Sequence, residues 1–62
     1  MPMTPKEMIN LLLKNGFIML NKYGSHQKMF HPDKNITTII PMHNKDLGKG
    51  LEHAILKQTG LK

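Results

Sequence analysis

The fold is decided by residues 17–31, which read FIMLNKYGSHQKMFH and predict a β-hairpin. Two runs with apolar and aromatic residues, Phe17 to Asn21 and Ser25 to His31, are typical of β-strands. Tyr23-Gly24 lies between them and predicts the turn, because glycine adopts turn conformations at little steric cost. Strands joined by so short a connection pair in antiparallel fashion.

A third strand follows the hairpin. Pro32-Asp33-Lys34-Asn35 has the composition of a turn. Ile36 to Ile40 is rich in β-branched residues, and Pro41 ends this run because proline cannot donate to a sheet ladder. The three strands therefore form an antiparallel meander.

A helix is predicted on the N-terminal side of the hairpin. Thr4 and Glu7 form a capping box, and Pro5 occupies the first helical position. Four residues give this helix an apolar face: Met8, Ile9, Leu11 and Leu12. Gly16 can end the helix in the left-handed conformation, and Phe17 can then fold back onto the last turn.

A second helix is predicted from Leu51 to Gln58, after an irregular and polar connection over residues 42–50. Its apolar face consists of Leu51, Ala54 and Ile55. Gly60 ends it, and Leu61 can fold back onto Leu56.

The predicted element order is α-β-β-β-α, an α+β fold in one domain over residues 1–62. Two amphipathic helices and one three-stranded antiparallel sheet form a core when both helices cover the same sheet face. The other face is then open to solvent. Because so short a chain builds a thin core, a stabilising protein partner is expected.

The alternation along the second strand assigns its side chains to the two faces. Met29 is the best core candidate, and the residues on its side are Ser25, Gln27 and His31. The residues on the open side are His26, Lys28 and Phe30. A slip by one residue, with Phe30 in the core, is the alternative. On the flanking strands, the pairs that share a face are Phe17 with Met19 and Ile36 with Ile40.

The chain has nine basic residues, all lysine, and four acidic residues, which gives a net charge of +5. This excess of positive charge favours a polyanionic partner. The candidates are nucleic acid, an anionic membrane and an acidic protein. Lysine contacts phosphate as a point charge, so base recognition through guanidinium groups is excluded. A basic surface that serves only solubility is the alternative.

The absence of cysteine excludes disulfides and thiolate zinc sites, and it fits a cytoplasmic protein. The longest apolar stretches, residues 8–13 and 17–20, fall short of the roughly 20 residues of a membrane span. No signal peptide is visible either. We therefore expect a cytoplasmic protein that does not cross a membrane.

The hairpin turn carries the residues with the clearest chemistry. His26 can act as a general base or acid, because imidazole titrates near neutral pH. Lys22 and Lys28 flank it and can hold phosphate. These are the parts of a small metal-independent ribonuclease, in which a base removes a 2′-hydroxyl proton and the oxygen attacks the neighbouring phosphorus. A surface histidine without catalytic function is the alternative.

The other histidines are weaker candidates. His43 follows the third strand and either assists as a second acid–base group or caps the next loop. We expect a structural role for His31 and an exposed position for His53. No close helical pair of histidines exists, so no metal site is expected. A dyad of Ser25 with His26 is not expected, because neighbours on a strand point to opposite faces.

Together these residues resemble the HicA family of bacterial toxins, the ribonuclease half of HicAB toxin–antitoxin systems. The resemblance covers nearly the whole chain and rests on an ordered set of segments: Asn15-Gly16-Phe17, Gly24-Ser25-His26, His31-Pro32-Asp33, Ile40-Pro41-Met42-His43 and Ile55 to Leu61. Gln27 departs from the family, since many relatives carry a second histidine or a basic residue there. Many relatives also carry arginines near the site, where this chain has only lysines.

The resemblance implies a fold like that of double-stranded-RNA-binding domains and cleavage of mRNA without metal or cofactor. It also implies that His26 is catalytic and that a HicB-like antitoxin binds the toxin and covers this residue. From the residues themselves, we expect Lys22 and Lys28 to contact phosphate and Ser25 to orient substrate or imidazole. A non-catalytic RNA-binding module and a protein-interaction module of the same fold are the alternatives.

Overall fold

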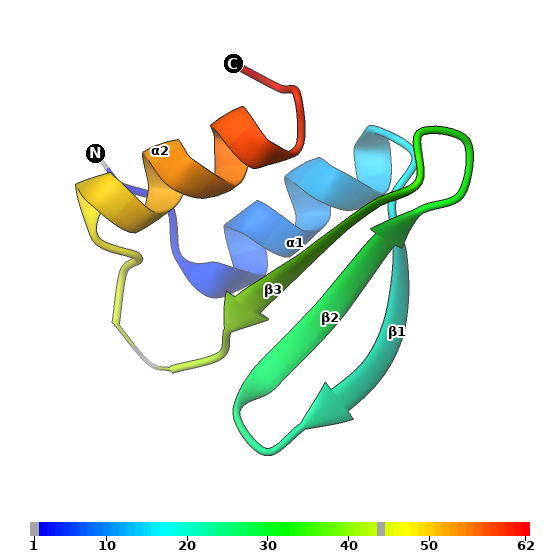
Figure 1. Ribbon diagram of the computed structural model, residues 1–62. Helices are drawn as coiled ribbons and strands as arrows, with labels where there is room; N and C mark the ends of the chain where they lie inside the picture. Colours follow the sequence, from blue (N-terminus) through cyan, green and yellow to red (C-terminus); the bar gives the residue numbers. More distant parts are fainter. Residues whose placement is uncertain (1, 44) are drawn as a thin grey trace.

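The computed structural model describes residues 2–43 and 45–62. Its elements follow the predicted order: α1 (Pro5–Lys14), β1 (Ile18–Tyr23), β2 (His26–His31), β3 (Ile36–Pro41) and α2 (Lys49–Gln58). The strands form one antiparallel sheet in the order β1-β2-β3. Both helices lie on the same side of the sheet (Figure 1). The predicted α+β architecture with one open sheet face is confirmed.

The hairpin turn is shifted by one residue from its predicted position. Tyr23 is the last residue of β1, and Ser25 belongs to the turn with Gly24. Gly24 has a φ of 59°, which is the conformation that a type II′ turn requires at its first central residue. The shift matters for the site, because it makes Tyr23 the direct cross-strand neighbour of His26.

The start of α1 is fixed by the predicted capping box. The Thr4 hydroxyl accepts a hydrogen bond from the Glu7 N–H at 3.1 Å, and the Glu7 carboxylate accepts one from the Thr4 N–H at 2.9 Å. Two of the N–H groups that have no partner within a helix are thereby satisfied. Pro5 follows at the first helical position, as predicted.

Both helices end in a Schellman motif. Gly16 follows α1 with a φ of 90°, and the Phe17 N–H donates to the Leu12 carbonyl at 3.0 Å. Gly60 has a φ of 79° after α2, and the Leu61 N–H closes the same type of bond. The chain is therefore turned back toward the core at both points where glycine predicted an end.

The core lies between the two helices and one face of the sheet. It consists of Met8, Ile9, Leu12, Phe17, Met29, Ile40, Leu47 and Ile55. The sequence did not indicate Leu47, which lies in the connection between β3 and α2 and is fully buried. Its N–H donates to the Met3 carbonyl at 2.9 Å. This contact joins the connection to the N-terminal segment.

β1 is the least covered strand. All six of its residues are exposed, because it forms one edge of the sheet and packs mainly against β2. Met19 pairs with Met29, so it faces the helix-covered side as predicted. It is nevertheless 51% exposed. The predicted face of Met19 is therefore right, but the residue adds little to the core.

Candidate nucleic-acid interface

The candidate catalytic histidine lies on the open face of the sheet. Burial alternates along β2: Gln27, Met29 and His31 are buried, whereas His26 is exposed and Lys28 and Phe30 are half-buried. The predicted register is confirmed, and the alternative with Phe30 in the core is wrong. His26 and Lys28 therefore point to the same side of the sheet.

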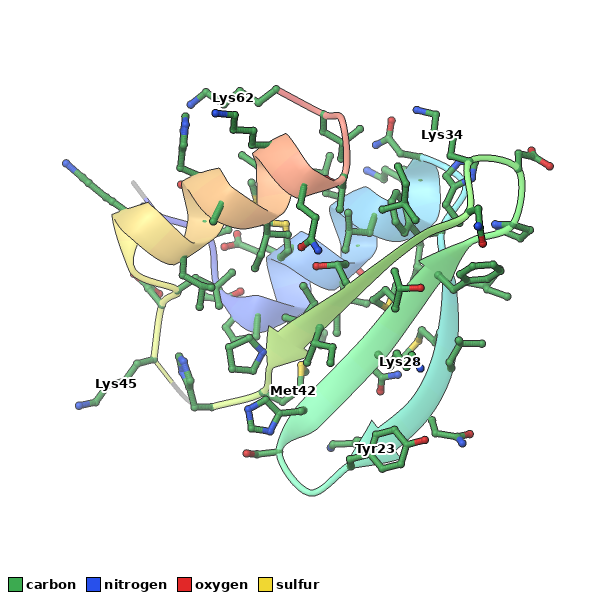
Figure 2. All side chains as sticks on the ribbon, in the orientation of Figure 1. Tyr23, Lys28, Lys34, Met42, Lys45 and Lys62 are labelled. Atoms are coloured by element: carbon green, nitrogen blue, oxygen red, sulfur yellow. The ribbon has the colours of Figure 1, made fainter. Side chains whose placement is uncertain are left out.

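His26 lies at the end of the sheet next to the hairpin turn. Its cross-strand partners are Tyr23 on β1 and Pro41 on β3. Residues directly opposite one another in an antiparallel pair share a face. Figure 2 shows Tyr23 and Lys28 on the side of the sheet away from the helices, with Tyr23 nearer the turn. The open face thus brings Tyr23, His26 and Lys28 together.

A bulge in β1 separates Lys22 from this group. Met19 pairs with Met29 and Lys22 pairs with Gln27, so two residues of β1 oppose Lys28 alone. The extra residue reverses the alternation of β1, and Lys22 therefore begins on the helix-covered side with Gln27. The same reversal brings Tyr23 onto the open face.

Gln27 stabilises this bulge. Its side-chain amide donates to the carbonyl of Leu20 at 2.9 Å and to that of Lys28 at 3.0 Å. A bulge interrupts the backbone hydrogen bonds between the two strands. The Gln27 amide provides a hydrogen-bond donor for these two carbonyls at that point. The departure from the family pattern at residue 27 therefore has a structural role that the sequence did not reveal.

Ser25 and His43 lie at the same end of the sheet as His26. The Ser25 carbonyl accepts a hydrogen bond from the Met42 N–H, which extends the pairing of β2 and β3 beyond Pro41. His43 is the next residue and is exposed, as is Ser25. The topology thus places a second imidazole at the sheet end that carries His26.

His31 has the structural role that the sequence predicted. It is buried, and its Nδ1 accepts a hydrogen bond from the Lys34 N–H at 3.1 Å, which holds the turn between β2 and β3. Its ring packs edge-on against Phe17, with 5.0 Å between the ring centroids. His31 therefore ties the end of the hairpin to the chain that leaves α1.

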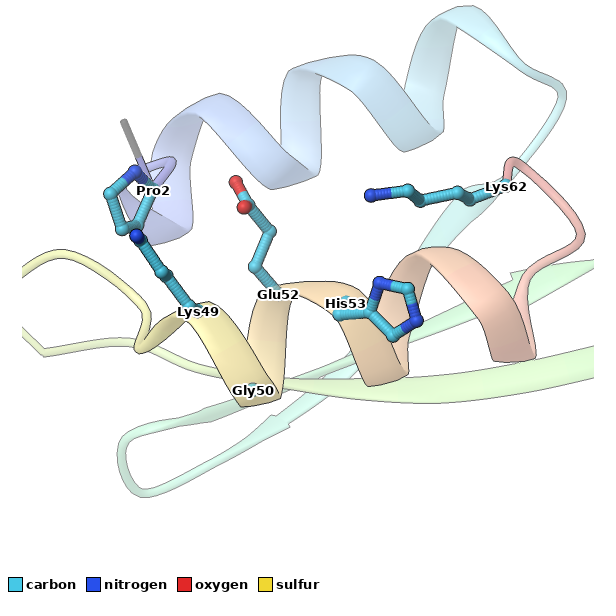
Figure 3. Close-up of a pocket in the computed structure, with 6 residues that line it drawn as sticks. All are labelled: Pro2, Lys49, Gly50, Glu52, His53 and Lys62. Carbon is cyan, nitrogen blue, oxygen red and sulfur yellow. The ribbon is translucent and has the colours of Figure 1, made fainter.

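A separate hollow lies against α2. It is lined by Pro2, Lys49, Gly50, Glu52, His53 and Lys62 (Figure 3). His53 is exposed, as predicted. None of the residues predicted to contact RNA lines this hollow, so it is not part of the candidate interface.

The charge distribution suits an anionic ligand on the open face. The four acidic residues of the chain all lie outside the strands: Glu7, Asp33, Asp46 and Glu52. A phosphate beside Lys28 would therefore meet no carboxylate from the sheet itself. In residues 2–43 and 45–62, no three histidine or acidic side chains are placed to share a metal ion. No helix in these ranges is long and apolar enough to cross a membrane.

Comparison with known proteins identifies one family. The family model described as HicA toxin of bacterial toxin–antitoxin matches residues 5–61 of the 62-residue chain. The match spans all five elements, from the first residue of α1 to the residue after Gly60. No curated protein matches the chain. The predicted family is confirmed.

Proposed function

Because the chain belongs to the HicA toxins of bacterial toxin–antitoxin systems, we propose that it is a metal-independent endoribonuclease that cleaves mRNA in the cytoplasm. The observation that carries the proposal is the position of His26. It is exposed on an open sheet face, two residues from Lys28, and the strands of that sheet bear no carboxylate. Such a surface can hold a phosphodiester next to an acid–base group.

The proposed reaction is a transesterification in which imidazole carries out the proton transfers. His26 accepts the proton of a ribose 2′-hydroxyl, and the 2′-oxygen attacks the adjacent phosphorus as the bond to the 5′-oxygen breaks. The products are a 2′,3′-cyclic phosphate and a 5′-hydroxyl. The departing oxygen takes its proton from the imidazolium of His26 or from His43, which lies at the same end of the sheet.

The neighbouring residues have different roles in this scheme. Lys28 shares the face of His26, so its ammonium group stabilises the negative charge that grows on the phosphoryl oxygens. Ser25 precedes His26 in the turn and orients the substrate or the imidazole. Lys22 begins on the helix-covered face of the sheet. It contacts phosphate from there and adds to the positive field that attracts RNA.

A HicB-like antitoxin is the proposed inhibitor, and the open face is its proposed docking surface. Phe30 pairs with Ile18 on β1, and Ile39 lies opposite Lys28 on β3. Ile18 and Ile39 are 44% and 49% exposed. Exposed apolar residues grouped beside a charged site are typical of a protein interface. An antitoxin bound there would block access to His26.

The test is cleavage of an mRNA by the purified protein in excess EDTA. We expect cleavage by the wild type and a loss of about 10²-fold or more for His26→Ala, as for removal of a general base or acid. His53→Ala is the matched control, because it removes an exposed imidazole from α2 and should keep full activity.

Two results would contradict the proposal. Binding of RNA without cleavage by the wild type would identify a non-catalytic RNA-binding module. Cleavage that stops in EDTA and returns with a divalent metal would show that the mechanism is wrong.

A further inference from the structure

Tyr23 is the aromatic residue nearest to His26 on the open face. The two residues are direct cross-strand partners, and Tyr23 is 60% exposed. Phe30, the other aromatic residue of this face, is four residues along β2 from His26, about 13 Å at the usual rise of a strand. Phe30 is also half-buried between Ile18 and Thr37. An aromatic surface beside the candidate catalytic group therefore comes from Tyr23.

The face on which Tyr23 lies is set by the bulge in β1. The bulge turns Tyr23 to the open face, and the Asn21 side-chain amide donates to the tyrosine hydroxyl at 3.3 Å. The hydroxyl thus has a partner within the protein, and the residue stays largely exposed. Figure 2 shows the ring over the hairpin end of the sheet, on the side of Lys28.

We propose that Tyr23 stacks on an unpaired RNA base next to the phosphodiester that is cleaved at His26, so that the toxin selects single-stranded RNA. This inference rests on the proposed ribonuclease function and adds a base subsite to it. Stacking on an aromatic ring tolerates any base, because every base has a π-face. It therefore suits a chain with no arginine for base readout. Duplex RNA would bind through Lys28 but would keep its bases stacked inside the helix.

The composition of the chain provides a direct probe of this contact. Tyr23 is the only tyrosine and there is no tryptophan, so intrinsic fluorescence reports on Tyr23 alone. The protein used is the His26→Ala variant, in which RNA cleavage should be slower by about 10²-fold or more. Three ligands are compared: oligoadenylate, an RNA duplex and inorganic polyphosphate. All three should bind, as followed by competition with a labelled RNA. Only oligoadenylate should quench the fluorescence.

Cleavage kinetics give a second measurement that does not depend on fluorescence. Tyr23→Ala should raise KM by roughly 5- to 150-fold, the usual effect of losing one base stack. Tyr23→Phe keeps the ring and should stay within about twofold of the wild type. On RNA that carries an abasic site next to the cleaved phosphate, Tyr23→Ala should have no further effect. The Tm of each variant is compared with that of the wild type, so that a loss of activity caused by unfolding can be recognised.

The outcomes separate this inference from the function on which it rests. If the wild type cleaves RNA, and Tyr23→Ala cleaves equally well or oligoadenylate binds without quenching, the stacking proposal is wrong and the ribonuclease proposal stands. If Tyr23→Ala weakens only antitoxin binding, the residue belongs to the protein interface and the base subsite is again wrong. If the wild type neither binds nor cleaves RNA, both proposals are wrong.

Discussion

At the scale of single residues, the bulge in β1 decides which side chains meet at His26. The face of His26 could be predicted, because Met29 anchors the alternation of β2 to the core. The positions of Lys22 and Tyr23 could not, because nothing in Leu20-Asn21 indicates an extra residue. The buried amide of Gln27 stabilises that bulge, and a polar residue on a strand does not by itself predict a buried role.

The two lysines that flank His26 should differ in their effect on RNA binding. Lys28→Ala should weaken the binding of different single-stranded RNAs about equally. It should also reduce the slope of log Kd against log salt by about 0.7, the value for one lost phosphate contact. Lys22→Ala also removes one positive charge, but from the helix-covered face of the sheet. It should therefore change both the RNA affinity and the salt slope less than Lys28→Ala does. The measurement is a salt titration of RNA binding with His26→Ala protein.

Equal effects of the two lysine substitutions would mean that RNA binding depends on net charge, and that it makes no difference on which face of the sheet the lysine lies. A change in base preference on replacing Lys28 would mean that this residue reads bases, contrary to its proposed phosphate contact.

At the scale of the elements, local chemistry predicted the helices better than the connections. The capping box of Thr4 and the glycines after both helices form backbone hydrogen bonds within a few residues, so the sequence alone indicates them. Leu47 has no such local partner. It is an isolated apolar residue among polar ones, and only the packing of the whole chain buries it.

Gly16 is the turn residue whose replacement should be most harmful to the fold. Its φ of 90° is strained for alanine, and a Cβ there would lie 2.7 Å from Nε2 of His31. Moving His31 would disturb its bond to the Lys34 N–H and its contact with Phe17. We expect Gly16→Ala to lower the free energy of unfolding by about 1–3 kcal/mol or more. The measurement is urea unfolding followed by circular dichroism.

Gly50→Ala is the matched control for Gly16→Ala. Gly50 lies in the first turn of α2, and a Cβ there would meet open space. Alanine favours the helix over glycine, so this variant should be as stable as the wild type or more stable by up to about 1 kcal/mol. Similar losses of stability in both variants would contradict the assigned role of Gly16.

At the scale of the whole molecule, the core is one-sided. Both helices pack on one face of the sheet, while the other face exposes Ile18 and Ile39 beside Lys28. The sequence predicted this arrangement, because two amphipathic helices and one sheet leave one face open. It did not predict that β1 is exposed along its whole length, since burial at a sheet edge depends on how far the helices extend over it.

The last prediction is that the antitoxin stabilises the toxin by covering the open face. A partner that binds only the folded state, at a free concentration 100 times its Kd, adds about 2.7 kcal/mol to the free energy of unfolding. For a domain of this size, that corresponds to a rise in Tm of roughly 10 °C or more.

Phe30→Ala should remove much of this rise in Tm, because buried aromatic residues at the centre of an interface dominate its affinity. Leu51→Ala, which removes an exposed apolar side chain from α2, should leave the rise unchanged. Thermal melts with and without antitoxin measure both effects, and hydrogen exchange locates the contact. An antitoxin that stabilises the toxin while leaving the amides of β2 unprotected would bind elsewhere, and its inhibition could not then depend on blocking His26.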